Sequence, residues 1–424
     1  MISEEIHEQI EFMARRARAA ALKLSQLSTD GKNAILAAMA TGLREATPAV
    51  LAANAKDLSA GGEKGLAPAM LDRLRLDEAR VEAIAGGIEQ VAGLPDPVGQ
   101  VMESWTRPNG MRLEQVRVPI GTIGIIFESR PNVTSDAAVL CLKAGNATIL
   151  RGGSEAIHSN RAIAEALASA GAAAGMPDNA IQLVPFTDRE SVTALCRMER
   201  WLDVIIPRGG RGLIGTVVSQ ARMPVIKHYD GICHTYVDAA ADPDMAVRIA
   251  VDAKTQKPGV CNAMETLLVH ESVAAGFLPR VAEALRAKGV ELRGCKRTRA
   301  VIDCQAATEE DWSTEYLDLI LSIRVVESLD EAVAHINSYG SHHSECIVTG
   351  DEGAASRFLS AVDSACVFHN VSSRFADGEE FGFGAEIGIS TEKLHARGPM
   401  GLRELTSYQY RIRGEGQTKG GEEP

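Results

Sequence analysis

The chain has 424 residues, of which 45% are hydrophobic and 24% charged, as expected for a soluble globular protein of two or three domains. Its 44 basic and 56 acidic residues give a net charge of −12, which argues against a general nucleic-acid or membrane-surface protein because phosphate polymers would be repelled. The charged amino terminus predicts no secretory signal, and no uncharged apolar run reaches the roughly 20 residues of a membrane span, so we expect a cytoplasmic protein.

The first hundred residues have a helical pattern. Three stretches share apolar residues at helical period: Ile6 to Leu24, Ile35 to Leu43, and Val81 to Ile88. Thr29-Asp30 is predicted to cap the second helix, and Gly93 with Pro95 is predicted to end the third. We expect a structural role for this region.

From Leu113 the pattern changes to strands that alternate with helices. The predicted elements, in order, are an exposed strand Leu113–Pro119, a buried strand Gly121–Phe127, helix Asp136–Lys143, strand Ala147–Leu150, helix Asn160–Gly171, strand Ile181–Val184, helix Arg189–Arg197 and strand Val204–Ile206. This alternation predicts a parallel sheet with helices on both faces.

A second α/β segment follows Val225. Its predicted elements are strand Cys233–Val237, helix Pro243–Ala253, strand Thr266–Val269, helix Val273–Lys288, strand Leu319–Val326, helix Leu329–Ser338 and strand Glu345–Val348. Residues 375–401 are rich in glycine, and we interpret them as a lid or an anion clamp. Ser407 to Arg413 is predicted as a last strand and the residues after it as a disordered tail.

Gly210, Gly212 and Gly215 match GxGxxG between a predicted strand and a predicted helix, where glycines let a backbone approach a pyrophosphate. Asp230 lies near the place of the acid that binds ribose in that fingerprint. The fingerprint belongs to the first strand–helix unit of a dinucleotide domain, whereas this match comes late in a chain with 39 glycines. It is therefore a weak signal.

The strongest chemical signal is the stretch VDAKTQKPGVCNAMETLLVH, residues 251–270. Pro258-Gly259 ends the preceding helix and Cys261 follows on a turn, with Lys254 and Lys257 within reach. A thiol on a rigid loop near fixed positive charge favours the nucleophilic thiolate. The alternative is an inert buried cysteine, the usual state of a free thiol.

The other cysteines carry no comparable signal. All eight are scattered without a CxxC pair, so we expect neither a disulfide framework nor a metal site. His342, His343 and Cys346 come nearest to a ligand cluster, and we interpret them as a solvated loop beside Gly340.

Five strings resemble the gamma-glutamyl phosphate reductase family, a branch of the aldehyde dehydrogenase superfamily: SRPNVTSDAAVLCLKAGNATILRGGSEA, IPRGGRGLI, KHYDGICHTYVD, KPGVCNAMETLLVH and GAEIGISTEKLHARGPMGL. The likeness runs from about residue 5 to residue 415. It implies an aldehyde-dehydrogenase-like α/β fold with a Rossmann-type NADP-binding domain over residues 1–227, in which 106–120 form part of an oligomerisation strand flap. Residues 228–370 would form the catalytic domain. Residues 371–424 would contain the glycine-rich return segment, an oligomerisation strand and the tail.

The resemblance also implies roles for individual residues. Cys261 takes the place of the nucleophile, and Arg151 stands where the superfamily has a lysine that reads the nucleotide. Ser154 falls where NAD-preferring relatives place a glutamate. A serine there would accept a 2′-phosphate, which favours NADPH over NADH. If the register shifted by one residue, the adjacent Glu155 would take this place and weaken the argument. Gly209-Gly210 matches the loop that opens the pyrophosphate-side helix.

Further roles concern catalysis and the substrate. Glu315 matches a glutamate that holds the nicotinamide ribose, and Asn132 is the candidate oxyanion amide, with the backbone N–H of Cys261 as the alternative. Arg130 and Lys257 are candidates to hold the phosphoryl group, and the amino-acid end of the substrate is expected to meet residues 384–390.

The residues Lys227-His228-Tyr229-Asp230-Gly231 replace the general-base glutamate of oxidising relatives, which favours the reductive direction. The expected reaction is the NADPH-dependent reduction of L-glutamyl 5-phosphate to L-glutamate 5-semialdehyde and phosphate, through a thioester on Cys261, in proline biosynthesis. We expect a homo-oligomer, dimer or tetramer, functionally coupled to glutamate 5-kinase and without nucleic-acid or membrane partners. The alternatives are an oxidising or CoA-acylating aldehyde dehydrogenase, a non-catalytic nucleotide-binding relative and, more distantly, a metal-binding protein.

Overall fold

The structure, a computed structural model, describes residues 3–419. The chain forms two compact units. Unit 1 comprises the chain up to Lys227 together with Phe383–Gly388 and the part from Met400 onward, and unit 2 comprises His228–Gly382 and Ile389–Pro399. The glycine-rich return segment therefore contributes to both units rather than forming a part of its own.

Helices begin unit 1: α1 (Glu4–Leu24), α2 (Thr29–Glu45), α3 (Thr47–Glu63), α4 (Pro68–Leu74) and α5 (Glu78–Gly93). The three predicted helices correspond to α1, α2 and α5. The predicted cap of α2 is wrong, because the Ser28 hydroxyl, one residue earlier, accepts the hydrogen bond from the Gly31 N–H. The sequence did not predict α3, whose alanine-rich stretch has few large apolar residues to mark a face.

A four-stranded parallel sheet with the order β5-β4-β3-β6 forms the centre of unit 1. Its strands and following helices are β3 (Thr122–Phe127), α6 (Asn132–Lys143), β4 (Ala147–Arg151), η1 (Ser154–Ala156), α7 (Ile157–Ala173), β5 (Ile181–Leu183), α8 (Arg189–Leu195), β6 (Val204–Arg208) and α9 (Arg211–Gln220). Every residue of β3 and β4 is buried, as their unbroken apolar runs predict. The predicted alternation is confirmed.

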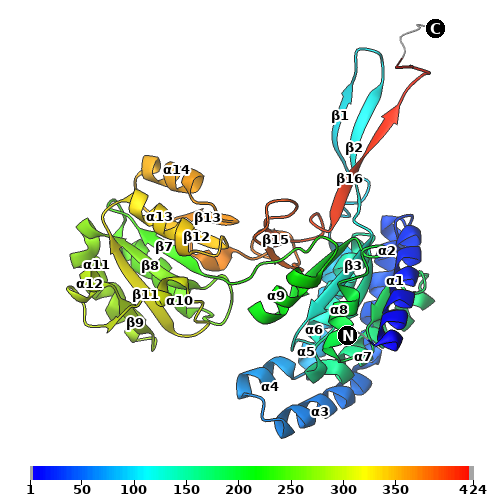
Figure 1. Ribbon diagram of the computed structural model, residues 1–424, viewed down its shortest axis with the longest axis horizontal. Helices are drawn as coiled ribbons and strands as arrows, with labels where there is room; N and C mark the ends of the chain where they lie inside the picture. The colour runs from blue at the N-terminus through cyan, green and yellow to red at the C-terminus, as the bar shows by residue number, and fades with distance from the viewer. Residues whose placement is uncertain (1–2, 420–424) are drawn as a thin grey trace. The chain divides into compact units, whose positions relative to one another are not determined.

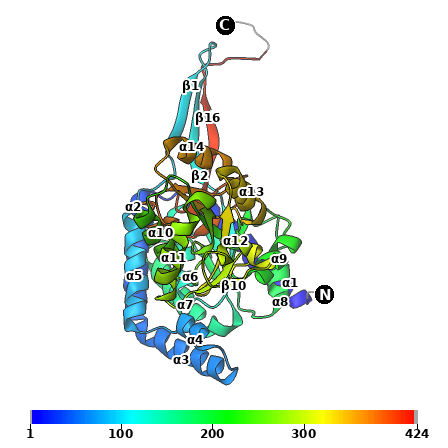
Figure 2. The ribbon, with the colours of Figure 1, turned by 90° about the vertical axis from the view of Figure 1, so that its left-hand side faces the viewer.

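A second, antiparallel sheet of unit 1 has the order β1-β2-β16, from β1 (Val101–Thr106), β2 (Arg112–Pro119) and β16 (Thr406–Arg413). Figures 1 and 2 show this strand flap extending away from the rest of unit 1, with α3 and α4 at the opposite end. The sequence predicted β2 and β16 but not β1, which is exposed almost throughout and lacks an apolar run. The flap presents five exposed large apolar side chains: Val101, Met102, Tyr408, Tyr410 and Ile412.

Unit 2 is built on a seven-stranded parallel sheet with the order β10-β9-β11-β8-β7-β12-β13. The strands are β7 (Cys233–Val237), β8 (Met264–His270), β9 (Glu291–Gly294), β10 (Gln305–Ala306), β11 (Ile320–Val326), β12 (Ser344–Val348) and β13 (Cys366–His369). The helices are α10 (Pro243–Thr255), α11 (Glu271–Arg286), α12 (Lys296–Arg299), η2 (Glu310–Ser313), α13 (Leu329–Tyr339), α14 (Glu352–Ala361) and η3 (Ser373–Phe375).

Both faces of this sheet are covered by helices. In β8, Leu267 and Val269 pack into the core under α10 and α11, whereas Leu268 packs into the core under α13 and α14. This alternation explains why β8 reads as one continuous apolar run.

The remaining strands, β14 (Gly388–Ser390) and β15 (Gly398–Met400), form a two-stranded sheet in the return segment. The predicted tail is exposed from Gly414 to Lys419, and its last residues lie outside the described part of the chain. Between residues 3 and 419, no helix has the length and apolar character that crossing a membrane would require.

Candidate active site

Four loops of unit 2 lead into the amino ends of four neighbouring strands. Glu315 precedes β11, Cys261 precedes β8, Gly231 precedes β7 and His343 precedes β12, and these strands are adjacent in the order β11-β8-β7-β12. Because the strands are parallel, the four loops gather along one edge of the sheet. The fold thus assembles residues that are distant in sequence around the candidate nucleophile.

Cys261 is half-buried on the loop between α10 and β8. The Gly231 backbone packs against it so closely that a Cβ at Gly231 would lie 1.9 Å from the Cys261 carbonyl oxygen. The Cys233 thiol donates a hydrogen bond to the same oxygen at 3.2 Å. Burial raises the pKa of Cys233 well above its usual value, which keeps this thiol protonated and able to donate. The loop of the candidate nucleophile is therefore held by the segment that leads into β7.

Glu315 supports the same loop indirectly. Its carboxylate accepts a hydrogen bond from the Gly231 N–H at 2.8 Å. Burial raises the pKa of Glu315, and the nearby Asp230 adds to this effect. The predicted contact of Glu315 with a nicotinamide ribose stays a prediction, and a carboxylate with two oxygens can accept both bonds.

A buried ion pair brackets the Cys261 loop. Lys254, near the end of α10, donates to Glu265, in β8, at 2.6 Å, and both side chains are fully buried. The second Glu265 oxygen accepts from the Leu317 N–H at 3.1 Å, which ties in the loop that carries Glu315. Burial lowers the pKa of Lys254 and raises that of Glu265, and each charge offsets the other's desolvation.

This pairing corrects the expectation that Lys254 serves the turn as a positive charge. It is committed to Glu265 instead. Lys257 is exposed, with no partner among the described residues, and keeps its charge available for an anion.

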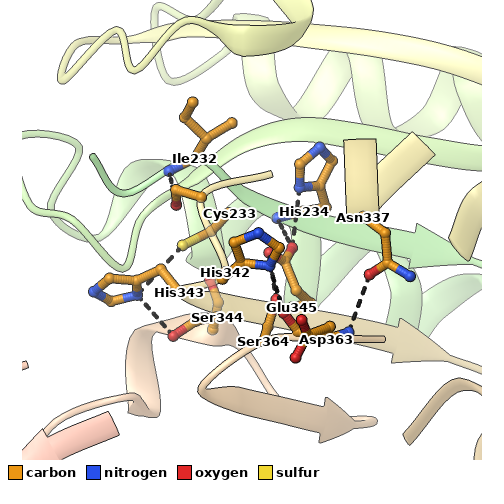
Figure 3. A network of polar contacts seen from close by, with 12 residues as sticks. Ile232, Cys233, His234, Asn337, His342, His343, Ser344, Glu345, Asp363 and Ser364 are labelled. Atoms are coloured by element: carbon orange, nitrogen blue, oxygen red, sulfur yellow. Dashed lines mark hydrogen bonds and ion pairs between the residues drawn. The ribbon is translucent and has the colours of Figure 1, made fainter. Parts of the chain in front are cut away.

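A buried polar network lies beside Cys233 (Figure 3). The Nδ1 atom of His343 lies 3.8 Å from the Cys233 sulfur and 2.9 Å from the Ser344 hydroxyl. Glu345 accepts two hydrogen bonds from His234, from its backbone N–H at 2.7 Å and from Nδ1 at 3.0 Å. Burial, together with the nearby His228, lowers the pKa of His343 to about 3, so His343 is neutral at pH 7.

The expectation of a solvated loop at His342–Cys346 is wrong. His343 and Cys346 are fully buried, because β12 begins at Ser344 in the interior of the sheet. Among the described residues, no three His, Cys, Asp or Glu side chains are grouped so that they could hold a metal ion.

The candidate residues of unit 1 follow the carboxyl ends of its strands. After β3, Arg130 is exposed and Asn132 opens α6. The Asn132 amide donates to Asp136 at 2.8 Å, and burial raises the pKa of Asp136 to about 6. One N–H of the proposed oxyanion amide is therefore already engaged.

Arg151 ends β4 and is buried. Its guanidinium makes four hydrogen bonds within the protein: to the Ser191 hydroxyl and to the carbonyl oxygens of Gly152, Thr187 and Asp188. An arginine has five N–H donors, so little capacity remains to bind a phosphate. These bonds support a structural role for the side chain, and its predicted contact with the nucleotide stays a prediction.

Ser154 is exposed at the start of η1. The adjacent Glu155 carboxylate accepts hydrogen bonds from the Ser129 N–H at 2.6 Å and from its hydroxyl at 2.7 Å. Ser129 has a positive φ of 42°, so Glu155 stabilises an unfavourable turn. The Glu155 carboxylate therefore has a structural role in this turn.

Gly209 and Gly210 form the turn between β6 and α9. The Gly210 N–H donates to a Glu128 oxygen at 2.9 Å, and a Cβ at Gly209 would lie 2.4 Å from that oxygen. A carboxylate thus lies at the start of α9, where helix N–H groups favour an anion. By contrast, Gly212 and Gly215 lie within α9 beside open space, so the late GxGxxG match is not a dinucleotide fingerprint.

These turns fit a nicotinamide dinucleotide. The turns at Ser154 and at Gly209-Gly210 follow β4 and β6 at the carboxyl edge of a parallel sheet, and the Gly210 N–H, at a helix amino terminus, already binds one anion, the Glu128 carboxylate.

Sequence reasoning missed Cys233, Glu265 and Asn262 in this site. Glu265 carried a usable signal, because it directly precedes the predicted buried strand Thr266–Val269, and an acid that is buried requires a partner. Cys233 and Asn262 had none, since each acts through contacts with residues that are distant in sequence.

Known proteins share this fold and have similar sequences. Residues 2–308 match the aldehyde dehydrogenase family. The gamma-glutamyl phosphate reductase of Moorella thermoacetica is 60% identical over 412 residues, which cover 97% of this chain and 99% of that protein. The crystal structure of gamma-glutamyl phosphate reductase from Thermotoga maritima has a TM-score of 0.95 at 46% identity, covering 97% of this chain and 99% of that one.

More distant structures share the fold alone. An acetylating aldehyde dehydrogenase from Geobacillus thermoglucosidasius has a TM-score of 0.68 at 17% identity, with 98% of each chain covered. The family is one of oxidoreductases that use a nicotinamide cofactor. The agreement in sequence, over nearly the whole of both chains, shows that this chain belongs to the gamma-glutamyl phosphate reductases of the aldehyde dehydrogenase family.

Proposed function

We propose that the chain catalyses the NADPH-dependent reduction of L-glutamyl 5-phosphate to L-glutamate 5-semialdehyde and phosphate, as a step of proline biosynthesis. The observation that carries the proposal is the half-buried Cys261, whose loop is fixed by Gly231 and by the Cys233 thiol. A nucleophile held in one position reacts faster, because the entropy of orienting it is lost when the protein folds and not during the reaction.

The Cys261 thiolate attacks the acyl carbon, the bond to the phosphoryl oxygen breaks, and a thioester forms as phosphate leaves. The exposed charges of Lys257 and Arg130 are suited to stabilise the departing phosphate. After reduction at the carbonyl carbon, the carbon–sulfur bond breaks, and the aldehyde leaves as the Cys261 thiolate is restored.

The nicotinamide supplies the hydride for this reduction. The turn at Gly209-Gly210 would hold the pyrophosphate, with Glu128 displaced from the start of α9. Ser154 would face the adenosine ribose, where a hydroxyl accepts the 2′-phosphate of NADPH and a carboxylate would repel it. The engagement of Glu155 with Ser129 supports this preference.

Two alternatives are less well supported. An oxidising enzyme needs a base to activate water, and the segment Lys227–Gly231 places no glutamate there. The sequence also argues against a CoA-acylating enzyme. The chain is 60% identical to a gamma-glutamyl phosphate reductase but only 17% identical to an acetylating aldehyde dehydrogenase.

We further propose that the strand flap joins subunits into a dimer or tetramer. Its exposed side chains at Met102, Tyr408, Tyr410 and Ile412 support this, because apolar patches of this kind mark interfaces. The acyl phosphate would come from a kinase that phosphorylates a γ-carboxylate, such as glutamate 5-kinase. The cytoplasm is the compartment that suits this chemistry, because it keeps thiols such as Cys261 reduced.

The test is NADP⁺ reduction by glutamate semialdehyde, with and without inorganic phosphate. We expect strict dependence on phosphate, because phosphate must release the acyl group from Cys261. Turnover supported by water or by CoA in place of phosphate would contradict the proposal.

A further inference from the structure

The segment after β13 returns to the nucleophile's loop. A turn at Asn370, with a φ of 59°, reverses the chain, and η3 then lies against α10, β7 and β12. Residues 372–376 thus run beside the loop that carries Cys261, within unit 2.

Three hydrogen bonds fasten this segment to Asn262, the residue next to the nucleophile. The Asn262 amide donates to the carbonyl oxygens of Arg374 at 3.3 Å and Ala376 at 3.0 Å, and the Asn262 carbonyl accepts from the Ser373 hydroxyl at 2.8 Å. Asn262 and Ser373 are buried, so these contacts fix the position of Arg374 relative to Cys261.

The Arg374 side chain is oriented by the other end of the same loop. Its Nε donates to the side-chain oxygen of Gln256, just after α10, at 2.9 Å. Its two terminal nitrogens, Nη1 and Nη2, make no hydrogen bond or ion pair with the described residues, and the side chain is half-exposed. The loop thus holds a guanidinium whose donor edge is open.

From this geometry we propose that Arg374 binds the α-carboxylate of the substrate and is a determinant of specificity for glutamyl over simpler acyl groups. The inference rests on the proposed function. A guanidinium presents two parallel donors that match a carboxylate, and three carbons of the substrate separate its α-carboxylate from the reacting carbon. An arginine fixed beside the residue after the nucleophile is within the reach of such a chain.

The phosphoryl group is the competing anion for Arg374. Lys257 lies on the loop that carries Cys261 and is exposed, so a cation other than Arg374 is available for the leaving group. If Arg374 binds the α-carboxylate, its loss raises KM for glutamate semialdehyde. If it binds the phosphoryl group, its loss raises KM for phosphate.

The experiment measures the phosphate-dependent reduction of NADP⁺ by full-length protein with Arg374→Met, Arg374→Lys and Arg357→Met. Arg357 is a matched control, because it is an exposed arginine of α14 that pairs with Asp330. Glutamate semialdehyde and butyraldehyde, which lacks the α-carboxylate, serve as substrates, and phosphate is varied separately.

We expect Arg374→Met to raise KM for glutamate semialdehyde by about tenfold or more, with kcat and KM for phosphate changed by less than about threefold. Arg374→Lys should recover part of the loss, and the control should match the wild type. The preference for glutamate semialdehyde over butyraldehyde, as a ratio of kcat/KM values, should fall with Arg374→Met, and this ratio cancels any general loss of active protein.

An unchanged ratio overturns the proposal, and so does a rise in KM for phosphate alone. If the wild type itself shows no phosphate-dependent turnover of glutamate semialdehyde, the proposed function fails, whatever the behaviour of the variants.

Discussion

The two units place their candidate residues at opposite ends of their parallel sheets. In unit 1 these residues follow the strands, as Ser154 follows β4 and Gly210 follows β6. In unit 2 they precede the strands, as Gly231 precedes β7 and Cys261 precedes β8. The loop after a strand leads into the amino terminus of a helix, whereas the loop before a strand comes from the carboxyl terminus of a helix.

This difference separates two kinds of chemistry. The start of α9 offers N–H donors and positive helix-dipole charge, which suit the phosphates of a dinucleotide. Cys261 instead follows the end of α10, where the dipole is negative and disfavours a thiolate. The helix end therefore does not stabilise the thiolate, and the exposed Lys257 of the same loop is the candidate to do so.

The largest effect should come from Cys261→Ala, which removes the nucleophile of unit 2 and leaves unit 1 unchanged. We expect the rate to fall by at least about a thousandfold while NADPH still binds to the protein. Steady-state turnover and a fluorescence titration with NADPH measure the two halves separately. Cys304→Ala, at a half-exposed thiol outside the site, should retain full activity. Residual turnover within tenfold of the wild type would show that another group does the chemistry.

Lys254→Met should destabilise the protein by about 3–5 kcal/mol, because it leaves the Glu265 carboxylate buried without its partner. Adding Glu265→Gln should recover most of this stability, since glutamine is uncharged and still accepts from the Leu317 N–H. Urea unfolding of both variants measures the change. Equal destabilisation of the single and the double variant would mean that packing, not charge, explains the loss.

Acid should weaken unit 2 through its buried histidines. The pKa of His343 is lowered from about 6.5 to about 3, so the unfolded chain binds more protons between these values. The stability that His343 contributes is fully present above pH 6.5 and is lost as the pH falls, by about 2 kcal/mol between pH 7 and pH 5. His335, whose pKa burial lowers to about 2, acts in the same direction.

His343→Asn should therefore lose less stability than the wild type between pH 7 and pH 5, by about 2 kcal/mol. Asparagine can keep the contact with the Ser344 hydroxyl that Nδ1 makes. Urea unfolding at the two pH values gives the difference, and His7→Asn, at an exposed histidine, is the control. The same acid loss in His343→Asn and in the wild type would contradict this assignment.

The smallest expected effect belongs to unit 1. Ser154→Glu should raise KM for NADPH by about tenfold and leave KM for NADH nearly unchanged, because a carboxylate repels the 2′-phosphate. Arg151→Met should lower stability without changing this preference, since its guanidinium is bonded within the protein. Initial rates with each cofactor provide the measurement. A selective loss of NADPH affinity in Arg151→Met would restore the predicted role of Arg151.

Local patterns were enough to predict much of the fold. The buried runs of β3, β4 and β7 were found from their apolar residues, and Cys261 was singled out from its turn and neighbouring lysines. Strand β13 was missed because its residues are only partly buried.

The supports of the site could not be found in this way. Cys233 contacts Cys261 across 28 positions of sequence, and Ser373 contacts Asn262 across 111. Such contacts follow from strand order, which a single sequence does not specify. The misjudged role of Lys254 has the same origin, because its charge is taken up by Glu265, a partner that only the fold brings near.

The most direct test is mass spectrometry of the protein, quenched in acid after incubation with glutamate semialdehyde and NADP⁺ in the absence of phosphate. We expect one glutamyl group attached to the peptide that contains Cys261, released when phosphate is added before the quench. A protein that turns over with phosphate, yet carries no acyl group on Cys261 or carries it on another residue, would contradict the account.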